Sequence, residues 1–281
     1  MQRVKEKAIQ LLKDGVVDRV IGWKAGEFFY DLTPAVFTTA EEVEKDFVWS
    51  VFSAANVSKY LIAESKKGGR IAAFLKPCDS YSFVQLCKEH RIAKENVYVV
   101  GVQCDGTCDI EKLKALGFKG VTGVEERGEE LLVSTLYGGK TAAKKDALLE
   151  RCTVCKSKRI AYFDELLGEQ GEDCGDARFE AVEKLEAMTP EERFAFWRGE
   201  LSRCIRCNAC RNVCPACSCE KCVFDNHALG TDNKAAADDF EENFFHIIRA
   251  FHVASRCTDC GECSRVCPQH IPLHLLNRKF I

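Results

Sequence analysis

Two stretches near the end of the chain share one pattern: residues 204–215 read CIRCNACRNVCP, and residues 257–268 read CTDCGECSRVCP. In each stretch four cysteines are spaced C-x2-C-x2-C-x3-C, and proline follows the fourth. Bacterial ferredoxins use this spacing for 4Fe–4S clusters, with three thiolates of a run on one cluster and the fourth on the neighbouring cluster. The pattern therefore predicts two 4Fe–4S clusters whose ligands are interleaved between the two runs.

Each predicted cluster takes three ligands from one run and the fourth from the other. One cluster is assigned to Cys204, Cys207, Cys210 and Cys267, and the other to Cys257, Cys260, Cys263 and Cys214. Zinc is the main alternative, but structural zinc sites usually combine two separated C-x2-C pairs. Two runs of four cysteines, each closed by proline, do not fit that arrangement.

The cysteine content sets the broad class of protein. The 281-residue chain has 18 cysteines, and eleven of them lie between Cys204 and Cys267. Residues 1–15 lack the apolar core of a signal peptide and no run of 18 apolar residues occurs, so we expect a cytoplasmic protein without a membrane span. Cysteines in that compartment serve metal binding or redox chemistry rather than disulfides. The net charge of −3 gives no bulk electrostatic argument for binding nucleic acid or an acidic membrane surface.

The uneven spread of cysteines predicts two domains, 1–175 and 176–281. In the first, the apolar runs 70–75 and 96–102 flank a helical segment, 80–90, which is the pattern of a βαβ unit. We therefore expect an α/β domain with a short parallel sheet. A long helical stretch over 40–65, broken near 54–56, and a hairpin over 120–139 are also expected.

The second domain is expected to be a mainly α-helical dicluster ferredoxin domain. The motif Thr189-Pro190-Glu191-Glu192 is a strong helix start, and 42 residues separate Cys214 from Cys257, more than the join in small β-rich ferredoxins. Within that join, an apolar stripe at helical spacing is predicted to pack in the core. Its members are Phe240, Phe244, Ile247, Ile248 and Phe251.

Four cysteines of the first domain form a weaker candidate site. Cys78 and Cys104 each follow a predicted strand, at the sheet edge where α/β proteins bind ligands. The motif RCTVC adds Cys152 and Cys155, and four thiolates at one edge would hold a third 4Fe–4S cluster. Buried packing cysteines are the alternative, and Cys108 is a rival for one ligand position.

Other side chains near these motifs have less settled roles. The segment CPACSCEKC could bind metal or carry free thiols, through Cys217, Cys219 and Cys222. Five arginines flank the runs and either raise the cluster potentials or form a docking patch: Arg203, Arg206, Arg211, Arg256 and Arg265. Four histidines are predicted to be surface or packing residues: His246, His252, His270 and His274. Cys87 and Cys174 look incidental.

Five stretches together resemble one family: KPCDSYSFVQL (76–86), VYVVGVQCDG (97–106), RCTVC (151–155), ERFAFWRGELSRCIRCNACRNVCPACSCEKC (192–222) and RAFHVASRCTDCGECSRVCPQHIPLHLLNRK (249–279). They resemble beta subunits of deazaflavin-coenzyme hydrogenases and dehydrogenases fused to a two-cluster ferredoxin domain. Within this family they are similar to the iron–sulfur B subunit of the flavin oxidoreductase partnered with heterodisulfide reductase in anaerobic bacteria. The resemblance implies flavoprotein and heterodisulfide reductase-like partners.

Three functions stay open at this point. The resemblance implies an electron-transfer subunit that relays electrons between a flavin oxidoreductase, NADH-linked or similar, and a heterodisulfide reductase-like complex. Alternatively, FAD bound to the first domain would make the chain a catalytic oxidoreductase subunit, although no Gly-x-Gly-x-x-Gly follows a strand and no Walker loop occurs. A zinc-bearing scaffold is the third. No catalytic residue is identified, so the sequence leaves open whether the chain is itself an enzyme.

Overall fold

The computed structural model of the chain describes residues 2–229 and 239–281. The chain divides into two compact units, Met1–Cys174 and Gly175–Ile281, which we call unit 1 and unit 2. No helix among the described residues is long and apolar enough to cross a membrane.

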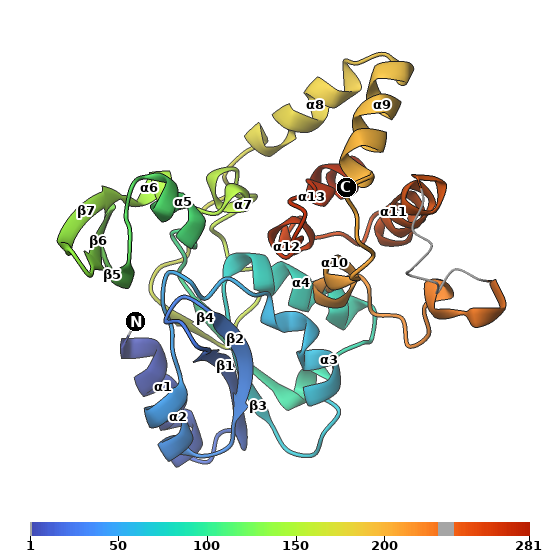
Figure 1. The fold of residues 1–281 in the computed structure, drawn as a ribbon. Helices are drawn as coiled ribbons and strands as arrows, with labels where there is room; N and C mark the ends of the chain where they lie inside the picture. The colour runs from blue at the N-terminus through green and yellow to red at the C-terminus, as the bar shows by residue number, and fades with distance from the viewer. Residues whose placement is uncertain (1, 230–238) are drawn as a thin grey trace. The chain divides into compact units, whose positions relative to one another are not determined.

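Unit 1 is built on a five-stranded sheet in the order β2-β1-β3-β4-β8 (Figure 1). The strands are β1 (Arg19–Ala25), β2 (Leu32–Phe37), β3 (Ile71–Leu75), β4 (Val97–Val102) and β8 (Glu165–Leu167). The pairs β1–β3, β3–β4 and β4–β8 are parallel, as expected, but β1 and β2 pair antiparallel. The sheet is therefore mixed rather than parallel, because the short connection between β1 and β2 has no room for a crossover.

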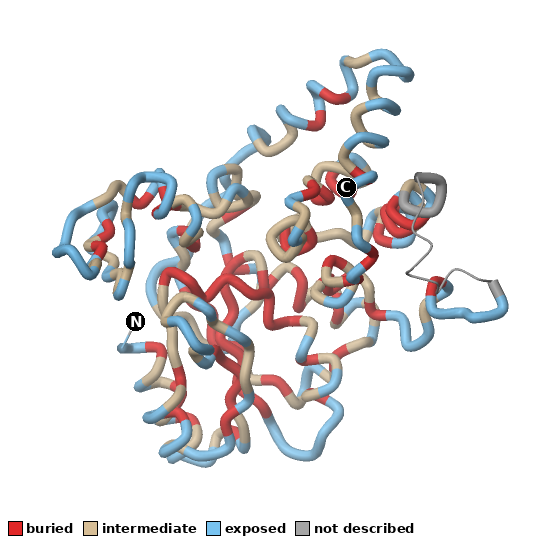
Figure 2. Tube along the Cα trace, viewed as in Figure 1, coloured by how far each residue is buried: buried red, intermediate tan, exposed pale blue. Residues whose placement is uncertain are grey.

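Helices cover both faces of this sheet. Helices α1 (Gln2–Lys13) and α2 (Ala40–Asp46) lie on one side, and α3 (Leu61–Glu64) and α4 (Pro77–Lys88) on the other (Figure 1). All five residues of β3 are buried, as its unbroken apolar sequence requires for a central strand. Figure 2 shows the buried residues concentrated along these central strands.

The expected long helix over 40–65 is wrong in its extent. Helix α2 ends at Asp46, and only the short turn η1 (Val57–Lys59) and α3 follow. Phe47 leaves the helix in an extended conformation, bridges to Lys24 and inserts its ring between Phe37 and Phe74. Burial of this ring ends the helix before the predicted break.

Close packing around Phe47 leads to a prediction for Gly22. A Cβ built on Gly22 of β1 would overlap the Phe47 ring, so Gly22→Ala is expected to lower the free energy of unfolding by about 1–3 kcal/mol through overpacking. Urea denaturation measures the change. Gly123→Ala is the matched control, because its nearest neighbour would lie 3.9 Å away. Equal losses in both variants would contradict the argument.

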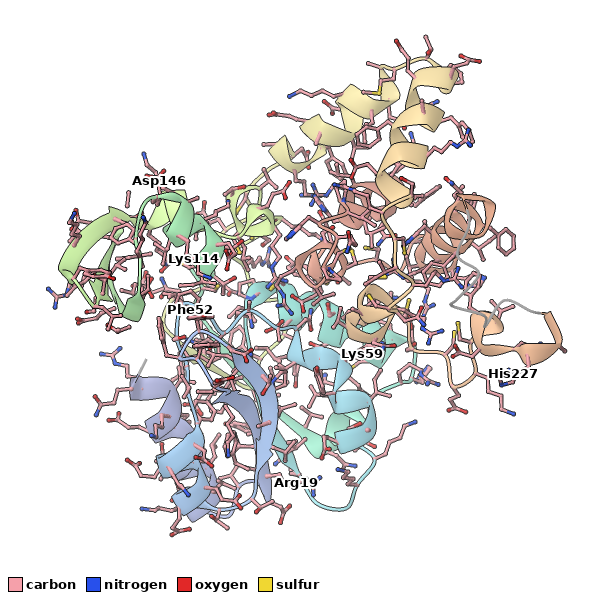
Figure 3. The ribbon with its side chains drawn as sticks, in the orientation of Figure 1. Arg19, Phe52, Lys59, Lys114, Asp146 and His227 are labelled. Carbon is pink, nitrogen blue, oxygen red and sulfur yellow. The ribbon has the colours of Figure 1, made fainter. Side chains whose placement is uncertain are left out.

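A second, three-stranded antiparallel sheet completes unit 1. Its strands are β5 (Val121–Arg127), β6 (Glu130–Thr135) and β7 (Gly138–Ala143), so the predicted hairpin is confirmed and a third strand extends it. Two short helices accompany it, α5 (Ile110–Ala115) and α6 (Lys144–Ala147). Phe52, labelled in Figure 3, belongs with Leu131 and Val133 to the apolar cluster under this sheet.

Unit 2 consists of helices and irregular loops in its described residues, so the expected helical architecture is confirmed only in part. Its α-helices are α8 (Glu180–Glu186), α9 (Pro190–Leu201), α10 (Ala209–Val213), α11 (Asp239–Val253), α12 (Glu262–Arg265) and α13 (Leu273–Arg278). Helix α9 begins with the predicted capping box, in which Thr189 and Glu192 each accept a hydrogen bond from the other's backbone N–H. The first two cysteines of each run lie in the loop before α10 or α12, the third lies within that helix, and the fourth follows it.

The predicted core stripe of α11 is wrong for Phe244, Ile247 and Phe251, which are exposed. Ile248 is half-buried and packs against the apolar cluster that contains Phe245, as predicted. The side chain of Phe240 lies outside the described residues. The buried face instead carries polar and charged groups among apolar ones: Phe245, His246, Arg249, Ala250 and Val253. Two buried polar side chains on one helix face indicate that this face meets something other than an apolar core.

Candidate iron–sulfur sites

The four candidate cysteines of unit 1 are placed in a series beyond the carboxyl ends of β3 and β4. Cys78 lies in the first turn of α4, Cys104 follows β4, and Cys152 lies in α7 (Glu150–Thr153), just before Cys155. Each thiol lies within electrostatic reach of the next. Burial first, then the Asp79 carboxylate and to a smaller extent the Cys104 thiol raise the pKa of Cys78, whereas burial and then the Cys152 thiol raise that of Cys104. Burial chiefly raises the pKa of Cys155, and Cys152 adds a smaller rise. We call these four residues the unit 1 thiol series.

Cys152 differs from its neighbours in this series. Burial alone would raise its pKa, but the adjacent Arg151 guanidinium and two hydrogen bonds from Thr107 hold it below its ordinary value. The Thr107 backbone N lies 3.4 Å and its hydroxyl oxygen 3.3 Å from the Cys152 sulfur. Thiolate is the form that binds iron, so this position favours a ligand.

Two other cysteines of unit 1 lie in different surroundings. Cys108, the rival ligand, is buried in the apolar cluster with Leu113 and Leu131, and burial raises its pKa to about 12. Cys174, which looked incidental in the sequence, lies within electrostatic reach of Cys155, and its backbone N–H donates to the Lys156 carbonyl at 3.1 Å. Sequence reasoning missed this neighbour because 18 residues separate Cys155 from Cys174 and no motif joins them.

A cavity of about 480 Å³ opens at the same edge of the sheet. Its lining comes from the ends of β4 and β8 and from the residues after β3, and includes Lys76, Cys104, Gly106, Thr107 and Lys144. Cys104 therefore belongs both to the unit 1 thiol series and to the wall of this sheet-edge cavity. A cavity at the carboxyl ends of parallel strands is the usual ligand position in α/β proteins.

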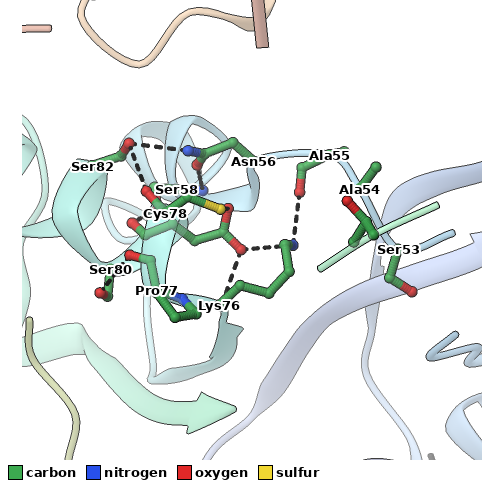
Figure 4. A network of polar contacts seen from close by, with 12 residues as sticks. Ser53, Ala54, Ala55, Asn56, Ser58, Lys76, Pro77, Cys78, Ser80 and Ser82 are labelled. Atoms are coloured by element: carbon green, nitrogen blue, oxygen red, sulfur yellow. Dashed lines mark hydrogen bonds and ion pairs between the residues drawn. The ribbon is translucent and has the colours of Figure 1, made fainter. Parts of the chain in front are cut away.

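Lys76 is fixed by a buried network at the rim of this cavity (Figure 4). Its ammonium pairs with Asp79 at 2.8 Å, donates to the Ala55 carbonyl at 3.2 Å and lies 4.4 Å from the centre of the Trp23 ring. Burial raises the pKa of Asp79 even though Lys76 opposes that rise. Lys144 is likewise buried and pairs with Glu126.

In unit 2 the two cysteine runs meet in one cavity. Its walls include three thiols of the first run and the last thiol of the second run: Cys204, Cys207, Cys210 and Cys267. This is the set assigned to one cluster from the spacing alone, and we call it the first thiol pocket. Figure 3 shows sulfur atoms gathered among the helices of this unit.

The two runs share an unusual backbone. The second residue after the first cysteine has positive φ in both runs, at Arg206 (50°) and Asp259 (60°). The fourth residue does too, at Asn208 (60°) and Gly261 (69°). Left-handed residues at matched positions turn each loop tightly, and the first three thiols of the first run line one cavity. The Arg206 N–H donates to the Cys204 sulfur at 3.4 Å.

The remaining four thiols form a second group. Burial raises the pKa of Cys257 and of Cys263 to about 12, and that of Cys260 further, and a charge on Cys214 adds to the rise in all three. Cys214 itself has a pKa lowered to about 5, chiefly by a hydrogen bond from the Cys217 thiol. The fourth thiol of the first run is thus placed among three thiols of the second run, and we call this the second thiol group.

These surroundings fit an anionic metal cluster. Thiols this deeply buried lose their protons only when a metal or cations compensate the charge. Among the described residues, the buried Nε atom of Arg249 has no hydrogen-bond acceptor, which is costly without a nearby negative charge. No group of His, Cys, Asp or Glu in the described chain is arranged to hold a single metal ion.

His246 contacts a predicted ligand. Its Nε2 atom lies 3.3 Å from the Cys204 sulfur, and the side chain is buried on α11. Burial, aided by the charges of Arg249 and Arg206, lowers its pKa to about 3. A neutral imidazole can donate Nε2–H to the thiolate, so His246 is a hydrogen-bonding neighbour of the cluster site rather than a surface residue. Nothing in the local sequence distinguishes it from the other histidines.

Comparison with known proteins supports iron–sulfur clusters in this part of the chain. Residues 200–271 match the family described as the 4Fe–4S dicluster domain. Unit 2 carries a 4Fe–4S dicluster domain.

Two curated proteins are similar to most of the chain. The F420-dependent formate dehydrogenase subunit beta of Methanocaldococcus jannaschii is 26% identical, over 94% of this chain and 84% of its own length. The F420-dependent formate dehydrogenase 1 subunit beta of Methanococcus maripaludis is also 26% identical, over 76% and 71%. These similarities support the deazaflavin-linked beta-subunit family inferred from the sequence, and give no support to the more specific heterodisulfide reductase-partnered subunit.

Among solved structures, the F420-reducing [NiFe] hydrogenase complex from Methanosarcina barkeri has a chain with a TM-score of 0.44 and 18% identity. The match covers 54% of this chain and 58% of that one. We draw no conclusion from a likeness of this size.

The segment CPACSCEKC lies within the dicluster domain, and its three cysteines go to different places. Cys217 packs against Cys214 in the second thiol group, Cys222 packs with the apolar cluster around Phe224, and Cys219 is exposed. The three thiols are therefore not brought together as a separate metal centre.

Proposed function

We propose that this chain is the iron–sulfur electron-transfer subunit of a multi-subunit oxidoreductase linked to a flavin or deazaflavin coenzyme. Clusters, when bound, carry single electrons. The first thiol pocket would hold one cluster, the second thiol group another and the unit 1 thiol series a third. The observation that carries the proposal is the first thiol pocket, where Cys267 joins three cysteines more than 50 positions away in the sequence.

The partners follow from the chemistry of the relatives. Their names describe F420-dependent enzymes, and a hydride-carrying coenzyme delivers two electrons together, whereas a cluster accepts one. A flavoprotein partner supplies that conversion. We further propose that the electrons pass between this flavoprotein, NADH-linked or similar, and a heterodisulfide reductase-like complex. The resemblance of the five sequence stretches supports this last step.

A second function is favoured by the sheet-edge cavity. If a flavin binds there, the chain itself would perform the hydride step. The ammonium groups of Lys76 and Lys144 and the backbone at Gly106, with φ of +106°, suit a phosphate-bearing cofactor. Because Cys104 lines the same cavity, a bound flavin would lie next to the unit 1 thiol series.

Anaerobic purification of the full chain separates these functions. We expect about twelve irons per chain for three clusters, or about eight for two, with a broad cluster absorbance and no flavin bands. Distinct flavin bands would instead establish the second function. Zinc without iron would contradict both. Proteins that co-purify under the same conditions identify the partners, and absence of any oxidoreductase subunit among them would contradict the relay.

A further inference from the structure

Arg249 lies on the buried face of α11, where it contacts Cys210 of the first thiol pocket. Val253, one turn further along the same face, packs with Cys214 and Cys257 of the second thiol group. We propose that the fixed positive charge of Arg249 stabilises the reduced state of both clusters of the dicluster domain and so raises both of their potentials. This inference rests on the proposed function, because it concerns clusters bound at those two sites. Arg249 is a positioning and tuning residue: it acts on the clusters through charge and takes part in no bond chemistry.

The burial and contacts of the Arg249 side chain place it beside the first thiol pocket. The side chain is only 3% exposed. One Nη atom donates to the carbonyl of Cys210 at 3.1 Å, which ties the guanidinium to the first thiol pocket. Its Nε atom is buried and has no hydrogen-bond acceptor among the described residues. A charged donor left without an acceptor inside a protein is expensive unless a negative charge lies close by.

The groups near Arg249 that can carry negative charge are cysteine thiols. Burial alone would lower the pKa of the guanidinium, yet the charges of four thiols hold it above its ordinary value. Cys210 belongs to the first thiol pocket, Cys214 and Cys263 to the second thiol group, and Cys217 packs beside Cys214. No carboxylate is among these groups. Arg249 is therefore compensated from both sites at once.

Three of the arginines that flank the cysteine runs are compensated differently. Arg203 pairs with Glu200, Arg211 with Asp225 at 2.8 Å, and Arg265 with Glu262 at 2.7 Å. Each of these charges is offset locally by a carboxylate and is at least partly exposed to solvent, where its field is screened. These three arginines are therefore poor candidates for raising the cluster potentials, whereas the buried Arg249, 35 residues after Cys214, is a strong one.

Reduction adds one electron to a cluster that already carries the charge of four thiolates. A buried cation favours that extra negative charge, and its effect is large because little water screens it. Since the charge of Arg249 interacts with thiols of both sites, replacing Arg249 should move both cluster potentials in the same direction. A residue that served only to pack α11 would leave the potentials unchanged once the protein had folded.

The test is an EPR-monitored redox titration of the anaerobically purified full chain carrying Arg249→Gln. Glutamine is neutral, and its amide can still donate to the Cys210 carbonyl. At a fixed potential, the ratio of reduced to oxidised cluster is expected to fall by about tenfold at both sites, which corresponds to about 59 mV for a one-electron couple. Arg249→Lys keeps the charge and should shift both potentials much less. Arg203→Met, which removes an exposed arginine paired with Glu200, should shift neither.

Every outcome decides the proposal. Two retained clusters with unchanged potentials in Arg249→Gln would overturn it, as would a shift confined to one cluster. If Arg249→Gln assembles no clusters while Arg249→Lys assembles both, the positive charge is required at this place and the proposal stands. Equal loss of clusters in both variants would show a purely structural role and overturn it. Absence of cluster signals in the unsubstituted chain would refute the proposed function instead.

Discussion

Replacing Cys267 with serine is expected to remove the cluster of the first run, although Cys267 belongs to the second. Cys267 lines the first thiol pocket together with Cys204, Cys207 and Cys210. A serine hydroxyl at one of four ligand positions seldom holds a cubane, so about four irons per chain should be lost. Iron analysis and EPR spectroscopy of the reduced protein measure the loss.

Four cysteine-to-serine variants together test which cysteines share a cluster. Cys267→Ser and Cys207→Ser should lose the same EPR signal, and Cys257→Ser should lose the other one. Cys219→Ser is the matched control, because Cys219 is exposed and outside both thiol sites. Loss of the same signal in Cys267→Ser and Cys257→Ser would show that each run binds its own cluster, and the interleaved assignment would be wrong.

Replacing Lys76 with methionine is expected to destabilise unit 1 by about 3–5 kcal/mol. Lys76 and Asp79 are 2% and 0% exposed and form an ion pair of 2.8 Å. Methionine fills most of the space but leaves the Asp79 carboxylate buried without its cation. Trp23 lies against Lys76, so its fluorescence should report the unfolding of this region in urea.

The loss of stability caused by Lys76→Met should increase as the pH rises. Burial already raises the pKa of Asp79 in the folded chain, and removal of Lys76 should raise it further. Protonation relieves the buried charge, so the variant should lose more stability as the pH rises through the folded pKa and less as the pH falls. Lys114→Met is the matched control: the exposed ion pair of Lys114 with Glu111 should contribute nothing measurable. A flat pH dependence for Lys76→Met would argue against a buried charge as the cause.

The local elements of the fold followed well from the sequence where the signal was itself local. The capping box at Thr189 and Glu192 and the unbroken apolar run of β3 are both read within a few residues. The helix over 40–65 was wrong beyond Asp46 because Phe47 is drawn into a core formed by Phe37 and Phe74, which lie elsewhere in the chain. The mixed character of the sheet was missed for a similar reason, since β2 carries only a weak strand signal of its own.

The buried face of α11 shows most clearly what helical periodicity fails to predict. Helical periodicity selected Phe244, Ile247 and Phe251 as core residues, on the assumption that burial follows hydrophobicity. The structure buries His246 and Arg249 instead, because that face meets thiol groups rather than an apolar core. Periodicity cannot detect a buried surface whose chemistry is ionic.

The type of cofactor could be predicted from the amino-acid sequence, because the spacing of cysteines within each run is a local property that a four-iron cluster imposes. The division between a cysteine-dense segment and a cysteine-poor one could be predicted in the same way. The residues that surround the predicted clusters became evident in the folded chain alone: Arg249 and His246 on α11, Cys217 beside Cys214, and Cys174 beside Cys155. These neighbours come from distant positions in the chain, so they become neighbours only when folding brings separate elements together.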